Sequence, residues 1–325
     1  PYFWGSLADR MAIHKRILTG LSVASLIMFS MLSDVDNFLM ISIFLGCFSF
    51  LMAGILPIGE ERTFSALSKK ANLYGRIRLW GSVGFILAVI FSGLIFENYG
   101  LIFFHTVTVI VLIVLVFSII FLPLKKEDIN VISHDSIFAV LRHPGVVFAF
   151  FSFFLMQVAH GPLNGFFSIF LEELGYSKFS IGLFWGLSVL AEIVLFFFLP
   201  KILKRFSIKK ILSLSAFLAA FRFFLIGWCS GSALVLCFSQ VLHAFTFGAF
   251  HAAGIAAVNR AFTYNSAVRG QALYTSLGYG AGGGLGVMLS GLGWSEFGGS
   301  WVFTGGAIVA LLSFMVIMFV PRVFD

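Results

Sequence analysis

Ten long apolar stretches run almost from end to end of this 325-residue chain, with short polar segments between them. Each stretch is long enough to cross about 30 Å of hydrocarbon as an α-helix. A helix satisfies its backbone hydrogen bonds within one segment, as lipid requires, and the stretches lack the alternation of transmembrane β-strands. The sequence therefore predicts an all-α polytopic membrane protein. The predicted spans are 17–33, 38–57, 79–96, 100–122, 145–171, 179–200, 210–229, 232–258, 268–292 and 300–320.

Composition and charge agree with this prediction. Hydrophobic residues make up 60% of the chain and charged residues 11%, with a mean hydropathy of +1.03, which leaves too little polar surface for a soluble domain. Of the 21 Lys and Arg residues, 19 lie in or directly beside one alternate set of loops, the exceptions being Lys178 and Arg222. The positive-inside bias places this set in the cytoplasm. The net charge of +7 therefore indicates topology and not nucleic-acid binding, because no basic face is formed.

Two basic loops resemble each other and suggest an internal repeat. Residues 9–18 match residues 204–212 with one residue dropped, and six spans plus a longer central loop would fill the distance between them. The second copy has nearly two spans before its basic loop, whereas the first has only a short stub. We therefore expect twelve spans in two six-helix halves, with this chain an N-terminal fragment that lacks one span and most of another. The expected divisions are an incomplete half at 1–122, a cytoplasmic central loop at 123–144 and a six-helix half at 145–325.

Several motifs resemble those of the major facilitator superfamily. Gly5-Ser6-Leu7-Ala8-Asp9-Arg10, followed by Lys15-Arg16, is similar to the loop 2–3 signature of that family, although Ala12 stands where a second Gly is usual. More specific segments resemble the phenylpropionic-acid transporter branch. They are residues 74–85, 243–251 and 269–274, with His160-Gly161-Pro162 and Ala191-Glu192.

This resemblance covers essentially the whole chain and carries several expectations. It implies a major facilitator fold in the bacterial inner membrane, and proton-linked uptake of an aromatic carboxylate by alternating access. It also implies a cytoplasmic gating motif that contains Gly5, Asp9, Arg10, Arg76 and Arg78. The alternatives are a nucleoside or sugar proton symporter, an efflux carrier of the same fold, or a non-transporting membrane sensor.

Polar residues inside the apolar spans are the candidates for solute and proton handling, because they are costly in lipid and tend to face an interior. In span 145–171, Gln157, His160 and Asn164 share one helix face by their spacings of three and four. They can line a substrate path or join neighbouring helices by hydrogen bonds.

A second pair of candidates carries opposite charges. Glu192 and Arg222 lie in adjacent antiparallel spans at similar depth. They can form a structural ion pair, or Glu192 can carry the coupled proton while Arg222 restrains it or meets an anionic substrate.

A third group lies along span 232–258. Gln240, His243, Phe247 and His251 follow each other at helix-face spacing and suit either packing or proton and substrate handling. The segment at 269–274 adds Gln271 and Tyr274 as candidate binding residues.

Other chemistries are not expected. No Cys, Asp or Glu joins the histidines at metal-ligand spacing, and no catalytic constellation is present, so we predict a protein that is not an enzyme and needs no cofactor. Residues 278–283 match the GxGxxG dinucleotide pattern, but they lie in a membrane span with no preceding strand. Gly278, Gly282 and Gly286 recur every four residues, which predicts close helix packing instead.

Overall fold

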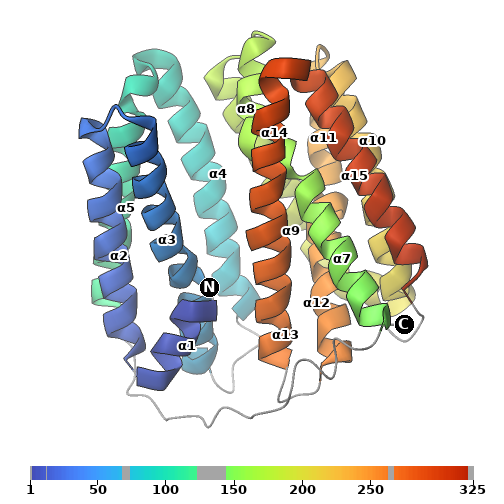
Figure 1. The fold of residues 1–325 in the computed structure, drawn as a ribbon, viewed down its shortest axis with the longest axis horizontal. Coiled ribbons are helices and arrows are strands. Elements are labelled where there is room, and N and C mark those ends of the chain that lie inside the picture. Colours follow the sequence, from blue (N-terminus) through green and yellow to red (C-terminus); the bar gives the residue numbers. More distant parts are fainter. Residues whose placement is uncertain (1, 12, 68–73, 123–143, 263–266, 321–325) are drawn as a thin grey trace. The chain divides into compact units, whose positions relative to one another are not determined.

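The computed structural model describes residues 2–11, 13–67, 74–122, 144–262 and 267–320, and every regular element in these ranges is a helix (Figure 1). The chain divides into two compact units. The first comprises residues 1–81 with 95–132, and the second comprises residues 82–94 with 133–325. The predicted central loop at 123–144 lies, apart from its last residue, outside the described residues.

The first unit is built around α2, which packs against both α3 and α5. Leu18 and Leu21 of α2 are buried with Ile58 of α3 and Ile119 of α5. A ring nitrogen of His105 lies 3.1 Å from the carbonyl oxygen of Phe29, which ties α5 to α2. The elements are α1 (Tyr2–Met11), α2 (His14–Ser30), η1 (Met31–Asp34), α3 (Phe38–Leu67), η3 (Leu101–Phe103) and α5 (Phe104–Phe121), with the ends of α4 (Tyr74–Tyr99).

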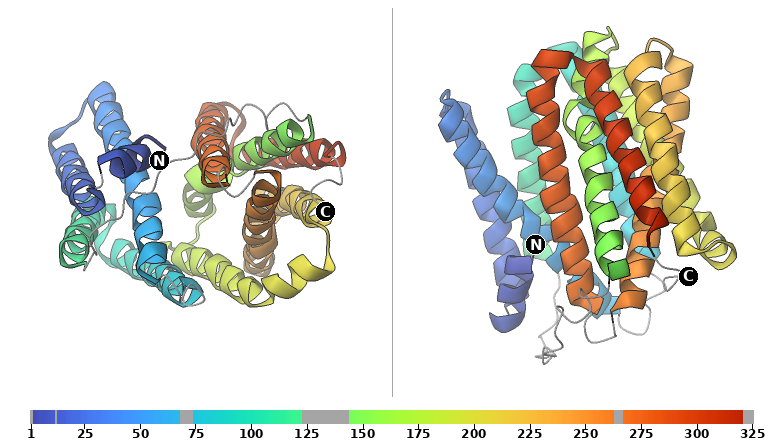
Figure 2. Two further views of the ribbon diagram at one scale, coloured as in Figure 1. Left: turned by 90° about the horizontal axis from the view of Figure 1, so that it is seen from below. Right: turned by 45° about the vertical axis from the view of Figure 1, so that its right-hand side comes forward.

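The second unit is a helical bundle with a larger buried core, in which α10 packs against α11 and α15 (Figure 2). Its elements are α7 (Pro144–Ala159), α8 (Gly161–Glu173), α9 (Lys178–Arg205), α10 (Ile208–Cys229), α11 (Ala233–His243), η4 (Ala244–Ala249), α12 (Phe250–Ala261), α13 (Ala267–Tyr274), η5 (Thr275–Gly282), α14 (Gly283–Phe297) and α15 (Gly299–Met318). The segments η4 and η5 are π-helical.

Nine helical segments among the described residues are long and apolar enough to cross a membrane, and each overlaps one predicted span. The tenth predicted span, 268–292, is helical as α13, η5 and α14, but it contains the π-helical segment and many glycines. Because glycine contributes little apolar surface, this segment is less hydrophobic than the other nine. The prediction of an all-α membrane protein with about ten spans is confirmed.

The span at 145–173 is broken into α7 and α8 at His160 (Figure 1). Pro162, in the first turn of α8, has no N–H to donate to the carbonyl of Val158 four residues earlier. That carbonyl faces Gly286 of α14, where an added Cβ would lie 2.5 Å from the oxygen. The break therefore leaves a backbone acceptor against which a neighbouring helix packs closely.

The predicted glycine packing is confirmed at two positions. A Cβ added at Gly282 would lie 2.7 Å from the carbonyl oxygen of Phe154, and one added at Gly286 would meet the backbone of Val158. Gly278 makes only ordinary contact, since its added Cβ would lie 3.6 Å from Gln157. Residues 278–286 thus bring η5 and α14 against α7 at backbone distance and hold Gln157 in this contact.

Candidate functional site

Arg222 is the centre of a buried polar cluster in the second unit. It lies in the middle of α10, within an otherwise apolar stretch, and its side chain is 0% exposed. The guanidinium donates through Nε to the carbonyl of Ser239 at 2.7 Å, and through one terminal nitrogen to Gln240 Oε1 at 3.1 Å. The other terminal nitrogen contacts His243 Nδ1 at 3.0 Å and Thr246 Oγ1 at 3.3 Å.

All four partners of Arg222 come from α11 and η4, and all four are neutral acceptors in this arrangement. Ser239, Gln240, His243 and Thr246 follow at spacings of one, three and three, so consecutive turns of one helix present them to α10. A buried cation stabilised by neutral groups alone is expensive, because hydrogen bonds replace only part of its hydration. The cluster therefore contains a buried positive charge whose hydrogen-bond partners are all neutral.

Glu192 approaches this cluster through His243. An arginine only donates hydrogen bonds, so Nδ1 of His243 must be the acceptor, and a neutral imidazole then carries its proton on Nε2. That nitrogen lies 3.8 Å from Oε2 of Glu192, whose side chain is 19% exposed. The order Glu192, His243, Arg222 differs from the direct ion pair considered from the sequence, because an imidazole lies between the two charges.

A column of rings continues from His243 along η4 and α12. Phe247 stacks on His243 with centroids 5.0 Å apart, and on His251 with centroids 6.4 Å apart. The hydroxyls of Tyr274 and Tyr279 lie 3.1 and 2.8 Å from Nδ1 of His251. The stripe predicted along 232–258 is thus a continuous polar and aromatic face.

The candidates on α7 reach the same region. Gln157 is buried, packs beside Gly278 and Gly282, and its side chain interacts with the hydroxyl of Tyr279. His160 lies edge-on to Phe223 of α10 at 5.0 Å and to Phe247 at 6.0 Å. These aromatic contacts place His160 one ring away from both Arg222 and His243.

Both π-helical segments of the described chain border this cluster. The η4 segment carries Thr246 and Phe247, and η5 carries Tyr279. A π-turn inserts one residue into a helix and re-aims the side chains around it, and such turns recur at functional sites. The sequence does not reveal either π-turn.

Most of the residues predicted from the sequence are brought together here. They are Gln157, His160, Glu192, Arg222, Gln240, His243, His251 and Tyr274. Two others have different surroundings: Asn164 is exposed on α8, one turn after His160, and Gln271 donates a hydrogen bond to Asn259 at 2.8 Å. Gly5, Asp9 and Arg10 lie in α1 and Arg76 and Arg78 in α4, but their side chains are not among those described.

Sequence reasoning missed Ser239, Thr246, Phe223 and Tyr279. Ser239 acts through its backbone carbonyl, which side-chain patterns do not mark, and Thr246 follows His243 at a helical spacing that the sequence analysis did not use. Tyr279 stands out only as an aromatic hydroxyl within a glycine run. Within the described ranges, no group of three or more His, Cys, Asp or Glu side chains is placed to hold a metal ion.

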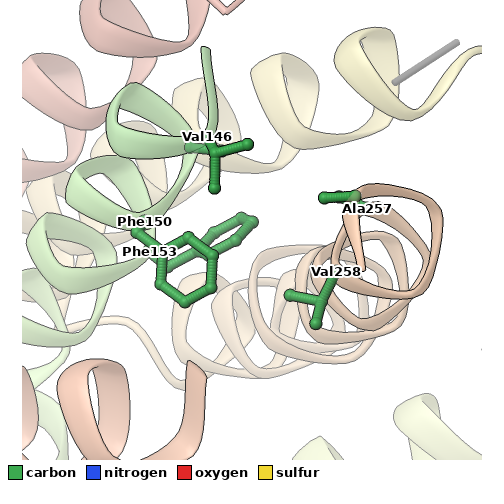
Figure 3. Close-up of a pocket in the computed structure, with 7 residues that line it drawn as sticks. Val146, Phe150, Phe153, Ala257 and Val258 are labelled. Atoms are coloured by element: carbon green, nitrogen blue, oxygen red, sulfur yellow. The ribbon is translucent and has the colours of Figure 1, made fainter. Parts of the chain in front are cut away.

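An apolar recess lies elsewhere in the second unit, between α7 and α12 (Figure 3). Its lining offers no side-chain hydrogen bond, so it lacks the polar groups that select a solute. The lining residues are Val146, Ala149, Phe150, Phe153, Ala257, Val258 and Ala261. The Arg222 cluster is therefore the better candidate for recognition.

Comparison with known proteins identifies the family. The model of the MFS_1 like family matches residues 1–305 of the chain. The chain belongs to the MFS_1 like family. The resemblance to the major facilitator superfamily seen in the motifs is thereby confirmed.

Two curated proteins are similar in sequence to this MFS_1 like protein. The "Probable 3-phenylpropionic acid transporter" of Escherichia coli (strain K12) is 26% identical over 216 residues, which are 64% of this chain and 55% of that protein. The "Multidrug resistance protein MdtG" of Rahnella sp. (strain Y9602) is 28% identical over 184 residues, 53% of this chain and 43% of that protein. The chain spans about half the length of the curated relatives it matches. None of these names describes an enzyme.

A solved structure shows the same fold. The crystal structure of the nucleoside transporter NupG superimposes with a TM-score of 0.82 and 18% sequence identity, and the match covers 98% of this chain and 85% of NupG. At this level of identity the likeness establishes the fold alone.

Proposed function

We propose that this MFS_1 like protein is a proton-coupled carrier of a small organic anion, with an aromatic carboxylate as its substrate. The observation that carries the proposal is Arg222, a fully buried guanidinium whose hydrogen-bond partners are neutral. The 3-phenylpropionic acid named for the Escherichia coli relative has this chemistry. The proposed setting is the lipid bilayer of a bacterial inner membrane.

Carboxylate recognition follows from the geometry of the guanidinium. Its planar fork matches two carboxylate oxygens, and a guanidinium binds an ionised carboxylate more strongly than a neutral acceptor. An incoming carboxylate would therefore replace Gln240 at one terminal nitrogen and His243 and Thr246 at the other. This exchange gives the buried charge an anionic partner in place of neutral acceptors.

Proton coupling follows from the tautomer of His243. While Arg222 donates a hydrogen bond to Nδ1, that nitrogen cannot also carry a proton, because two N–H donors would then face each other. A substrate that takes over Arg222 releases Nδ1, and the imidazole can then bind a proton while Glu192 faces its other nitrogen at 3.8 Å. Binding of the anion and binding of the proton thus favour each other, as symport requires.

The aromatic part of the substrate has complementary surroundings. Phe223 and Phe247 lie beside the guanidinium and the imidazole, and Tyr279 approaches Phe247 edge-on at 6.0 Å. Aromatic rings favour offset or edge-on contacts at such distances. A flat ring attached to a carboxylate can therefore pack among them while the carboxylate meets Arg222.

Uptake into proteoliposomes tests the proposal. Labelled 3-phenylpropionate, a nucleoside and a sugar are presented with and without an inward proton gradient. We expect gradient-dependent accumulation of the aromatic acid, and loss of that accumulation when Arg222 is replaced by Gln. Accumulation of the nucleoside or sugar alone, or export of the acid, would favour the neutral-solute symporter or the efflux carrier instead.

A further inference from the structure

His160 is a buried histidine whose two ring nitrogens have different surroundings. Nδ1 lies 2.8 Å from the carbonyl oxygen of Met156, one turn earlier in α7. Nε2 is buried and has no hydrogen-bond partner among the described residues. The whole side chain is 1% exposed, so water at the protein surface does not reach this nitrogen.

The contact with Met156 determines whether Nε2 of His160 is a hydrogen-bond donor or acceptor. A carbonyl oxygen only accepts, so Nδ1 carries the proton, and in the neutral imidazole Nε2 is then a bare acceptor. A cationic ring is disfavoured here, because it would bury an unpaired charge near Arg222. The helix backbone itself therefore holds His160 as an acceptor that still needs a donor.

Two aromatic rings contact both His160 and another residue of the cluster. Phe223 is fully buried in α10, whereas Phe247 is partly exposed and belongs to the π-helical segment η4. Phe247 contacts His160 edge-on and His243 face-on. Phe247 therefore lies against both His160 and His243, so a solute held at His243 is one ring away from His160.

We infer that Nε2 of His160 accepts a hydrogen bond from a hydroxyl or N–H group of the transported solute, which makes the preferred substrate a hydroxylated aromatic acid. This inference rests on the proposed function for the carboxylate, but the donor requirement is separate from it. Arg222 offers only donors and His160 offers only an acceptor, so the two ends of the site select opposite chemistry. A site with an unpaired buried acceptor discriminates strongly against ligands that lack the matching donor.

Equilibrium binding to the purified full chain in lipid nanodiscs tests the inference. Three kinds of ligand with one scaffold are compared: 3-phenylpropionate, its ring-hydroxylated derivatives and the corresponding methoxy derivatives. A nucleoside and its deoxy analogue are measured in parallel as a pair of neutral ligands that differ in one hydroxyl group. At least one hydroxylated ligand should bind about tenfold more tightly than its unsubstituted parent, and the methoxy form should lose the gain because it cannot donate.

Variants assign that preference to His160. In His160→Phe the hydroxyl preference should fall to about onefold, because the ring is kept and the acceptor is lost. His160→Gln keeps an acceptor and should retain part of the preference. Glu172→Gln is the control, since Glu172 pairs with Lys178 at 2.7 Å outside the cluster and its loss should leave the preference unchanged.

The outcomes separate this inference from the proposed function. Equal binding of hydroxylated and unsubstituted acids, or a preference that survives in His160→Phe or in the methoxy series, overturns the role of His160 and leaves the carboxylate carrier standing. A His160-dependent preference seen only for the nucleoside pair rejects the carboxylate and supports the donor requirement. Failure of every ligand to bind rejects both. The methoxy series uses the native protein, so the result does not depend on whether His160→Phe folds.

Discussion

Arg222 lies 3.0 Å from Nδ1 of His243, and this single contact determines where the imidazole keeps its proton. Because the guanidinium can only donate, a neutral His243 carries its proton on the nitrogen that faces Glu192. The imidazole of His243 therefore lies between the side chains of Arg222 and Glu192 and contacts one with each ring nitrogen. This arrangement makes the roles of Arg222, His243 and Glu192 experimentally separable.

Replacing Glu192 by Gln should separate proton coupling from substrate binding. The amide keeps the shape of the side chain but cannot titrate. We expect gradient-driven accumulation of 3-phenylpropionate in proteoliposomes to be abolished, while exchange of internal for external substrate continues. Glu172→Gln is the matched control, because Glu172 pairs with Lys178 near the surface of the second unit and should be dispensable. Accumulation that survives Glu192→Gln would remove Glu192 from the coupling step and point to His243 and His251.

Replacing Arg222 by Lys should impair the protein although the charge is kept. An ammonium cannot reproduce the planar fork, so Ser239, Gln240, His243 and Thr246 cannot all keep their partner. We expect a loss of stability of about 1–3 kcal/mol in thermal unfolding and a large loss of carboxylate binding. Arg205→Lys, at the exposed end of α9, is the control and should change neither quantity. An unaltered affinity in Arg222→Lys would argue against bidentate recognition of the anion.

A methyl group at Gly286 should disrupt the contact between α14 and α7. The added Cβ would meet the backbone of Val158, which cannot move aside as a side chain can. We expect Gly286→Ala to destabilise the detergent-solubilised protein by about 1–3 kcal/mol. Gly284→Ala tests the same change two residues away, where nothing lies within 4 Å of the added atom, and should be neutral. Equal melting temperatures for the two variants would contradict the close approach.

The charge bias of the loops predicts the side of the membrane on which each end of α9 and α10 lies. The loop at 201–209 belongs to the basic set, and Gly231 belongs to the opposite set. In a background without native cysteines, an impermeant thiol reagent applied to intact cells should label Gly231→Cys but not Lys204→Cys. Both positions are exposed in the structure, so a difference in labelling reports the side of the membrane. The reverse pattern would invert the topology.

The sequence by itself determined the parts of this structure that depend on local chemistry. Runs of about 20 apolar residues require helices in lipid, and a glycine at every fourth position lets η5 and α14 approach α7. Spacing along one helix likewise grouped Gln240, His243 and His251 on a single face, because the helical period is a property of the backbone. These features can be predicted without knowing which helix packs against each face.

Only the tertiary structure decided which of these faces meet and what each polar group bonds. Asn164 follows His160 at a helical spacing, but His160 is buried whereas Asn164 is exposed. The π-turns of η4 and η5 re-aim Thr246 and Tyr279 into the cluster, and the acceptor state of His160 depends on a carbonyl in its own helix. A hydrogen bond depends on the position of both partners to within a fraction of an ångström. The positions of donor and acceptor depend on how helices distant in sequence pack against each other. The residue pattern along a single helix carries no information about that packing.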